Sequence, residues 1–147
     1  MIANPKKYEG LEMSPQARAM LDDRPATFAS LCNGVGSEVG TWWQRWLYRV
    51  TPNTIWGMDI TPASDIHDVE YTVPDHFNSK FNAENYRHES DMRFRRNIDV
   101  LADRGWWVLR AKRKARARAY YYVLRQFGAE SFYAGKTIGG GRPPTTL

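Results

Sequence analysis

The sequence predicts a mostly α-helical protein built as one domain. Its 147 residues fall within the size range of a single hydrophobic core. Two segments begin with a serine or threonine followed by proline, and two others stop at a glycine; both signals are typical of helices. Alternating strand patterns are few, and no internal repeat occurs. We therefore expect a core of two or three long helices with a glycine-rich loop and few or no strands.

The predicted helices are separated by loops that contain proline, glycine or asparagine. Thr61 is the expected cap of the second helix and Pro62 its first residue. Gly105 and Gly128 are expected to end the two longest helices. The four predicted helices cover residues 38–50, 61–71, 83–104 and 109–127.

The chain is expected to divide into three segments. Residues 1–27 form an N-terminal arm of prolines and charges, with one short helical turn after Ser14-Pro15. Residues 28–134 form the helical domain. Residues 135–147 (GKTIGGGRPPTTL) have no pattern and form a flexible C-terminal tail that is extended or mobile unless a partner orders it.

Composition excludes several classes of protein. The chain is 42% hydrophobic and 25% charged, which is ordinary for a globular protein and excludes wholesale disorder. No apolar run approaches the roughly 18 residues of a membrane span, and the first ten residues lack the apolar stretch of a signal peptide. The single cysteine, Cys32, excludes an internal disulfide and a cysteine-cluster zinc site. We expect a soluble protein from a reducing compartment.

Positive charge is concentrated in one short block. The chain has 21 Lys and Arg against 16 Asp and Glu, a net charge of +5. Such a block favours a polyanionic partner, either nucleic acid or an anionic membrane surface, although a solvated helix face is the commonest outcome. The basic residues of the block are Arg110, Lys112, Arg113, Lys114, Arg116 and Arg118.

Two helices carry residues that could form a catalytic site. His67, Asp68 and Tyr71 share one predicted helix, where Tyr71 lies one turn beyond His67. Asp91 lies on the next helix, at the start of an apolar stripe that continues through Phe94. A carboxylate on an apolar face needs a partner, and a histidine on a facing helix can supply it. A half-exposed Asp91 paired with Arg95, one turn further on, is the structural alternative.

The order and spacing of these residues resemble phospholipase A2, above all the small, disulfide-free viral type. The resemblance rests on an HD-x-x-Y helix, an upstream glycine-rich loop and a downstream Asp on a second long helix. Its motifs here are Cys32-Asn33-Gly34-Val35-Gly36, Thr61 to Tyr71 and Ser90 to Phe94. Cys32 stands where the family has tyrosine, although only its main-chain carbonyl is needed. The later AYYYVLRQFGAESFY segment is similar to small phage proteins with the same HD core.

The resemblance implies a mechanism for ester hydrolysis. His67 would be the general base, Asp91 would fix its tautomer, and Tyr71 would support a carboxylate. The Gly34 amide could donate to the oxyanion. Calcium is the implied cofactor. Its expected ligands are the Asp68 carboxylate and the carbonyl groups of Cys32, Gly34 and Gly36.

Two functions from different classes follow. The first is calcium-dependent, phospholipase A2-like hydrolysis of a phospholipid ester at a membrane surface by a protein of phage origin. The second is a non-catalytic virion or assembly protein that uses the same scaffold to contact other virion subunits. A nucleic-acid contact through the basic block is a third possibility. The six tryptophans fit membrane contact, but in a small helical protein they also fit a core or a subunit interface. The expected location is the phage virion or the host cytoplasm.

Overall fold

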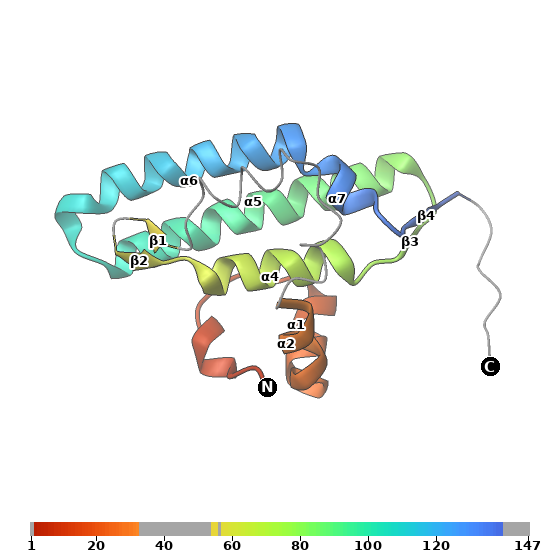
Figure 1. Cartoon of the computed structure of the whole chain (residues 1–147), viewed down its shortest axis with the longest axis horizontal. Helices are drawn as coiled ribbons and strands as arrows, with labels where there is room; N and C mark the ends of the chain where they lie inside the picture. The colour runs from red at the N-terminus through yellow and green to blue at the C-terminus, as the bar shows by residue number, and fades with distance from the viewer. Residues whose placement is uncertain (1, 33–53, 56, 140–147) are drawn as a thin grey trace.

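The computed structural model describes residues 2–32, 54–55 and 57–139, and it confirms a mostly helical architecture. Among the described residues, the three longest helices are α4 (Thr61–Thr72), α5 (Lys80–Arg104) and α6 (Trp107–Phe127). They run side by side in Figure 1, with α5 between α4 and α6. The chain turns back at Gly105, so α5 and α6 form a helical hairpin.

Short elements surround these three helices. The N-terminal segment contains a 3₁₀-helix, η1, and two α-helices, α1 and α2, which lie below α4 in Figure 1. Two antiparallel strands, β1 and β2, precede α4, whereas β3 and β4 form a parallel pair. The predicted helix at 38–50 lies outside the described residues. The bounds are η1 Pro5–Tyr8, α1 Pro15–Asp23, α2 Pro25–Cys32, β1 Thr54–Ile55, β2 Met58–Asp59, β3 His76–Phe77, α7 Ala129–Tyr133 and β4 Thr137–Ile138.

The start of α1 agrees with the sequence prediction, whereas the start of α4 does not. Ser14 accepts a hydrogen bond from the Ala17 amide at 3.2 Å and is followed by proline, as the sequence predicts. The prediction that Thr61 caps α4 is wrong, because Thr61 is the first residue of that helix. The carboxylate of Asp59 accepts from the Thr61 amide at 2.8 Å instead. Asp59, two residues before Thr61, therefore supplies the hydrogen-bond acceptor at the start of α4.

The hydrophobic core forms on both sides of α4 and α5. On one side, Leu21 and Phe28 from the N-terminal helices pack with Ile66 of α4. On the other side, Ile98 of α5 and Tyr120 of α6 belong to a second buried cluster. The middle of α4 therefore lies between these two buried clusters, and the faces of α4 and α5 that contact each other are removed from water. No helix within the described ranges is long and apolar enough to cross a membrane.

The N-terminal segment contains more structure than the single helical turn that the sequence predicts. Buried polar groups of α4 and α5 hold its backbone and side chains. Asp65 accepts from Lys7 Nζ at 2.6 Å and from the Tyr8 hydroxyl at 3.0 Å. Glu70 accepts from the Ser14 amide at 2.6 Å. These contacts are long-range, so helical periodicity within the segment could not indicate them.

Part of the expected C-terminal tail is tied to the helical domain. Thr137–Ile138 pairs with His76–Phe77 in the parallel β3–β4 pair. Lys136 Nζ donates to the carbonyl oxygens of Tyr71 and Pro74, at the end of α4. The start of this segment is thus extended and bound to the domain, whereas residues 140–147 lie outside the described residues.

We predict that Asn97→Ala lowers the free energy of unfolding by about 2–3 kcal/mol, because it removes a buried amide and leaves two partly buried main-chain groups without their partner. Asn97 accepts from the Glu12 amide at 2.7 Å and donates to the Glu12 carbonyl at 2.9 Å. The neighbouring Arg96→Ala removes only an exposed ion pair with the Glu12 side chain and should cost less than about 1 kcal/mol. Urea unfolding measures both values, and equal losses would contradict the prediction.

Candidate functional site

The structure brings His67, Tyr71 and Asp91 together between α4 and α5. His67 Nε2 lies 2.9 Å from Asp91 Oδ1, and the Tyr71 hydroxyl donates to the same oxygen at 2.6 Å. All three side chains are buried, and Asp91 is 0% exposed. The expected contact between His67 and Asp91 is therefore present. The alternative, a half-exposed Asp91 paired with Arg95, is wrong, since the Arg95 guanidinium lies over the Tyr121 ring instead.

Helix geometry explains why these groups meet. His67 and Tyr71 are four residues apart on α4, so both project from one face of that helix toward α5. Their ring centroids are 4.1 Å apart. The ring of Phe94, one turn beyond Asp91 on α5, lies 5.0 Å from the His67 ring. The imidazole is thus held between two aromatic rings, and one of its nitrogen atoms is directed at the carboxylate.

The second oxygen of Asp91 binds an arginine that the sequence analysis did not single out. Arg125, on α6, donates from Nη1 to Asp91 Oδ2 at 3.0 Å. Arg87, one turn before Asp91 on α5, approaches the same oxygen at 3.9 Å. Arg125 lies 34 residues beyond Asp91, in the helix whose basic residues suggested a surface for polyanions. Its role depends on the packing of α6 against α5, which the local sequence does not encode.

Glu84 completes this network one turn before Arg87. Its carboxylate accepts two hydrogen bonds from Arg87, at 2.7 and 3.0 Å, and a third from Arg125. The Tyr133 hydroxyl of α7 donates to it at 3.0 Å. Two carboxylates and two guanidinium groups therefore balance, so the network has no net charge before His67 is counted. The spacing of Glu84, Arg87 and Asp91 along one face of α5 is the sequence signal that could have indicated this network.

These contacts keep Asp91 ionised. Burial alone would raise the pKa of Asp91, but hydrogen bonds from His67, Tyr71 and Arg125 outweigh it and hold the pKa below its ordinary value. Burial, together with the charge of Asp91, raises the pKa of the Tyr71 hydroxyl, which stays protonated and donates. The site consequently presents a carboxylate that only accepts hydrogen bonds.

Asp68 lies beside this site in a different environment. Its carboxylate is half-buried, and none of the described residues donates a hydrogen bond to it. Burial raises its pKa to about 6, and the neighbouring Asp65 adds to the shift, whereas His67 opposes it. A carboxylate in this state is a suitable ligand for a hard cation.

Cys32 ends α2 close to Asp68. Its Sγ donates to the carbonyl oxygen of Asp65 at 3.7 Å and to that of Phe28 at 3.2 Å. Burial and the charges of Asp65 and Asp68 raise the pKa of the thiol to about 12, so it stays neutral. Gly34 and Gly36, the other residues of the predicted calcium loop, lie outside the described residues. Within the described ranges, no group of three or more His, Cys, Asp or Glu side chains is placed to hold a metal.

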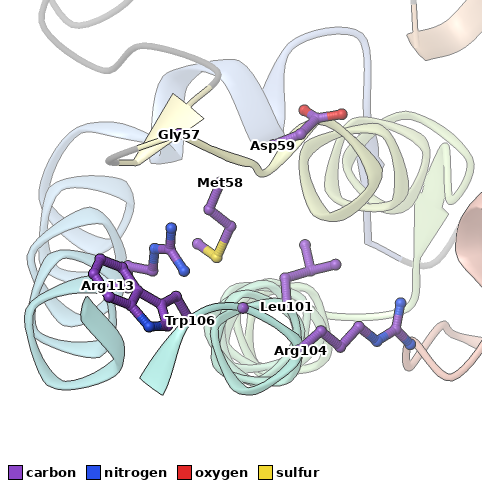
Figure 2. Close-up of a pocket in the computed structure, with 8 residues that line it drawn as sticks. Gly57, Met58, Asp59, Leu101, Arg104, Trp106 and Arg113 are labelled. Carbon is purple, nitrogen blue, oxygen red and sulfur yellow. The ribbon is translucent and has the colours of Figure 1, made fainter. Parts of the chain in front are cut away.

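A separate pocket lies at the far end of α5. Figure 2 shows it between β2, the end of α5 and the start of α6. The volume of this pocket is about 260 Å³. None of the predicted site residues lines it. Its polar side chains already have structural contacts. Arg104 donates to the Glu9 carbonyl, and Asp59 accepts from the Thr61 amide. Arg113 packs over Gly105. This pocket does not belong to the His67 site.

Comparisons of the chain with protein-family models, with curated proteins and with solved structures gave no match. The function therefore has to be inferred from the site alone.

We predict that the stabilising effect of Glu84 is lost in acid. Hydrogen bonds from Arg87, above all, lower the pKa of Glu84 to about 2. Because the folded-state pKa lies below the ordinary value of 4.5, the contribution is full above about pH 4.5 and disappears as the pH falls to about 2. Glu84→Gln should therefore be less stable than the wild type at pH 7, with a difference that narrows over this interval.

Urea unfolding at a series of pH values measures this difference, with Glu89→Gln, a change at an exposed carboxylate of the same helix, as the control. A difference between the wild type and Glu84→Gln that does not depend on pH would contradict the assigned ion pairs.

Proposed function

We propose that the protein is a calcium-dependent ester hydrolase of the phospholipase A2 type that acts on phospholipid at a membrane surface. The observation that carries the proposal is the buried contact of His67 and Tyr71 with one oxygen of Asp91, across two facing helices. The resemblance of the sequence implies this arrangement of histidine, tyrosine and aspartate. The proposal also draws on the half-buried Asp68 next to His67.

The hydrogen bonds of Asp91 determine which nitrogen of His67 can act as a base. Because Asp91 is ionised, it can only accept, so Nε2 must carry the proton that lies between the two side chains. The other nitrogen, Nδ1, then has a free lone pair. We propose that Nδ1 takes a proton from a water molecule while the water oxygen attacks the ester carbonyl carbon. Asp91 would stabilise the resulting imidazolium.

The residues around Asp68 fit a calcium ion in part. The Asp68 carboxylate has no donor among the described residues, and the neighbouring Cys32 leads into the glycine-rich segment that would supply main-chain carbonyls. When bound, calcium would polarise the ester carbonyl. The Gly34 amide would donate a hydrogen bond to the oxyanion. The metal ligands would thus be the carbonyls of Cys32, Gly34 and Gly36 together with Asp68.

A non-catalytic role as a virion or assembly protein is the second candidate. Large apolar side chains on the surface favour it, since such groups often mark contacts between subunits. Trp107 and Phe81 are each 73% exposed, and Ile2 and Trp106 are also exposed. In this case the HD helix would be a scaffold, and particles would incorporate the protein equally well after His67 is replaced. The phage origin of the chain is a prediction that rests on the resemblance.

Hydrolysis of phosphatidylcholine liposomes in calcium tests the proposal. We predict that His67→Gln lowers the rate at least about 10³-fold, because it removes the general base. The glutamine amide can still donate to Asp91, so the thermal unfolding midpoint should change little. His88→Gln, a change at an exposed histidine of α5, should retain full activity. Equal activity of wild type and His67→Gln would contradict the assignment of the base.

Calorimetric titration with calcium separates the metal site from the chemistry. The wild type should bind calcium at millimolar concentration or below, and Asp68→Asn should abolish binding while leaving the helical circular dichroism unchanged. Hydrolysis should disappear in the same variant. If the wild type neither binds calcium nor releases fatty acid, the catalytic proposal fails, and the structural role becomes the better explanation.

A further inference from the structure

Helix α6 has a strongly cationic outer face. The helix contains seven basic residues and no acidic residue. Its buried side, with Arg113, Ala117 and Tyr120, faces α5. In Figure 1, α6 forms the outer edge of the three long helices, on the side of α5 away from α1 and α2. Its opposite side is therefore a surface, and the charge on that surface is of one sign.

The basic side chains lie on both flanks of a narrow ridge. Ala111, Ala115 and Ala119 are exposed and follow one another at four-residue intervals along the ridge. At about 100° per residue, Lys112 and Arg116 lie about 60° and 100° to one side of Ala115. Arg118 and Lys114 lie at the same angles on the other side. Small side chains therefore let the helix backbone approach a partner while cations reach outward on both sides.

Neighbouring charges reduce this field only in part. Asp103 of α5 pairs with Lys114 at 2.8 Å and with Arg110 at 3.2 Å. Asp99, also on α5, lies close enough to Lys114, Arg95 and Arg118 for their charges to lower its pKa against the larger effect of burial. Both acids lie beside the flank of α6 that carries Lys114 and Arg118. Lys112, Arg116 and Arg118 are exposed, and the Arg116 guanidinium lies over the ring of the buried Tyr120.

We propose that this outer face of α6 binds duplex nucleic acid through its phosphates. An α-helix with side chains is about 10–12 Å across, and the major groove of B-DNA is about 12 Å wide. An alanine ridge fits into such a groove, and the two basic flanks then face the phosphate rows on either side. This inference is independent of the proposed hydrolase activity.

The same surface is less suited to a bilayer. A helix that lies in a membrane surface inserts a continuous row of large apolar side chains, whereas this ridge consists of alanine. The large exposed apolar groups of α6 lie near its two ends, with Trp107 and Val108 at its start and Tyr122 and Phe127 at its end. About 21 Å of helix separates Val108 from Tyr122. Arg118 lies close to the ridge itself, where a bilayer would require an apolar group.

Fluorescence anisotropy with a labelled 24-base-pair duplex tests the proposal. Two phosphate contacts from each flank, four in all, predict a slope of about −3.6 for the logarithm of the binding constant against the logarithm of the salt concentration. The affinity of the wild type should therefore fall roughly 150-fold between 50 and 200 mM salt. Lys112→Gln/Arg118→Gln should reduce the slope by about 1.8 and weaken binding roughly 10- to 100-fold at 100 mM salt. The matched control, Lys6→Gln/Arg18→Gln, removes the same charge at exposed residues of the N-terminal segment and should bind like the wild type.

Three results would overturn the proposal. The first is no duplex binding by the wild type at 50 mM salt. The second is equal weakening in both double variants, which would show a response to net charge alone. The third is binding to vesicles of phosphatidylserine and phosphatidylcholine without binding to the duplex, which would assign the surface to a membrane. Thermal unfolding of each variant checks that the helices remain folded, as expected for changes at exposed side chains.

Discussion

The buried, ionised carboxylate of Asp91 is the constraint on which the rest of this structure depends. An unpaired charge in an apolar interior is very costly, and removing one partner of a buried ion pair typically costs about 3–5 kcal/mol. Asp91 on α5 meets that cost with His67 and Tyr71 of α4 and with Arg125 of α6. The Asp91 side chain thus requires α4, α5 and α6 to pack in fixed positions relative to one another. The same contacts fix the orientation of the His67 imidazole.

The pairing of Asp91 with His67 could be predicted from sequence because Asp91 lies in an apolar stripe of its helix and His67 lies on the helix that was expected to face it. Such periodicity identifies the face of a helix that is buried, and a charged residue on that face demands a partner. The same reasoning predicted the start of α1 at Ser14 and Pro15. The cap of α4 could not be found this way, because Asp59 and Thr61 are both acceptable caps and only the path of the chain selects between them.

Other parts of the site and fold depend on distant contacts. Arg125 belongs to a helix whose basic residues are mostly exposed, so composition gave no reason to separate it from its neighbours. Arg125 can be assigned to the site only when the angle at which α6 packs on α5 is known. The N-terminal segment is similar: Asp65 and Glu70 hold it through residues more than fifty positions away. Local periodicity carries no information about such pairs. The glycine-rich loop, with Gly34 and Gly36, lies outside the described residues, so its predicted role is still a prediction.

The proposed chemistry depends on one atomic detail, the position of the proton on His67. Correlation spectra of the ¹⁵N-labelled imidazole at pH 8, assigned by comparison with His67→Gln, measure it directly. The contact with an ionised Asp91 predicts a protonated Nε2 and an unprotonated Nδ1 in the folded protein. A proton on Nδ1 with a bare Nε2 would contradict the hydrogen bond to Asp91, and with it the base assigned to the reaction.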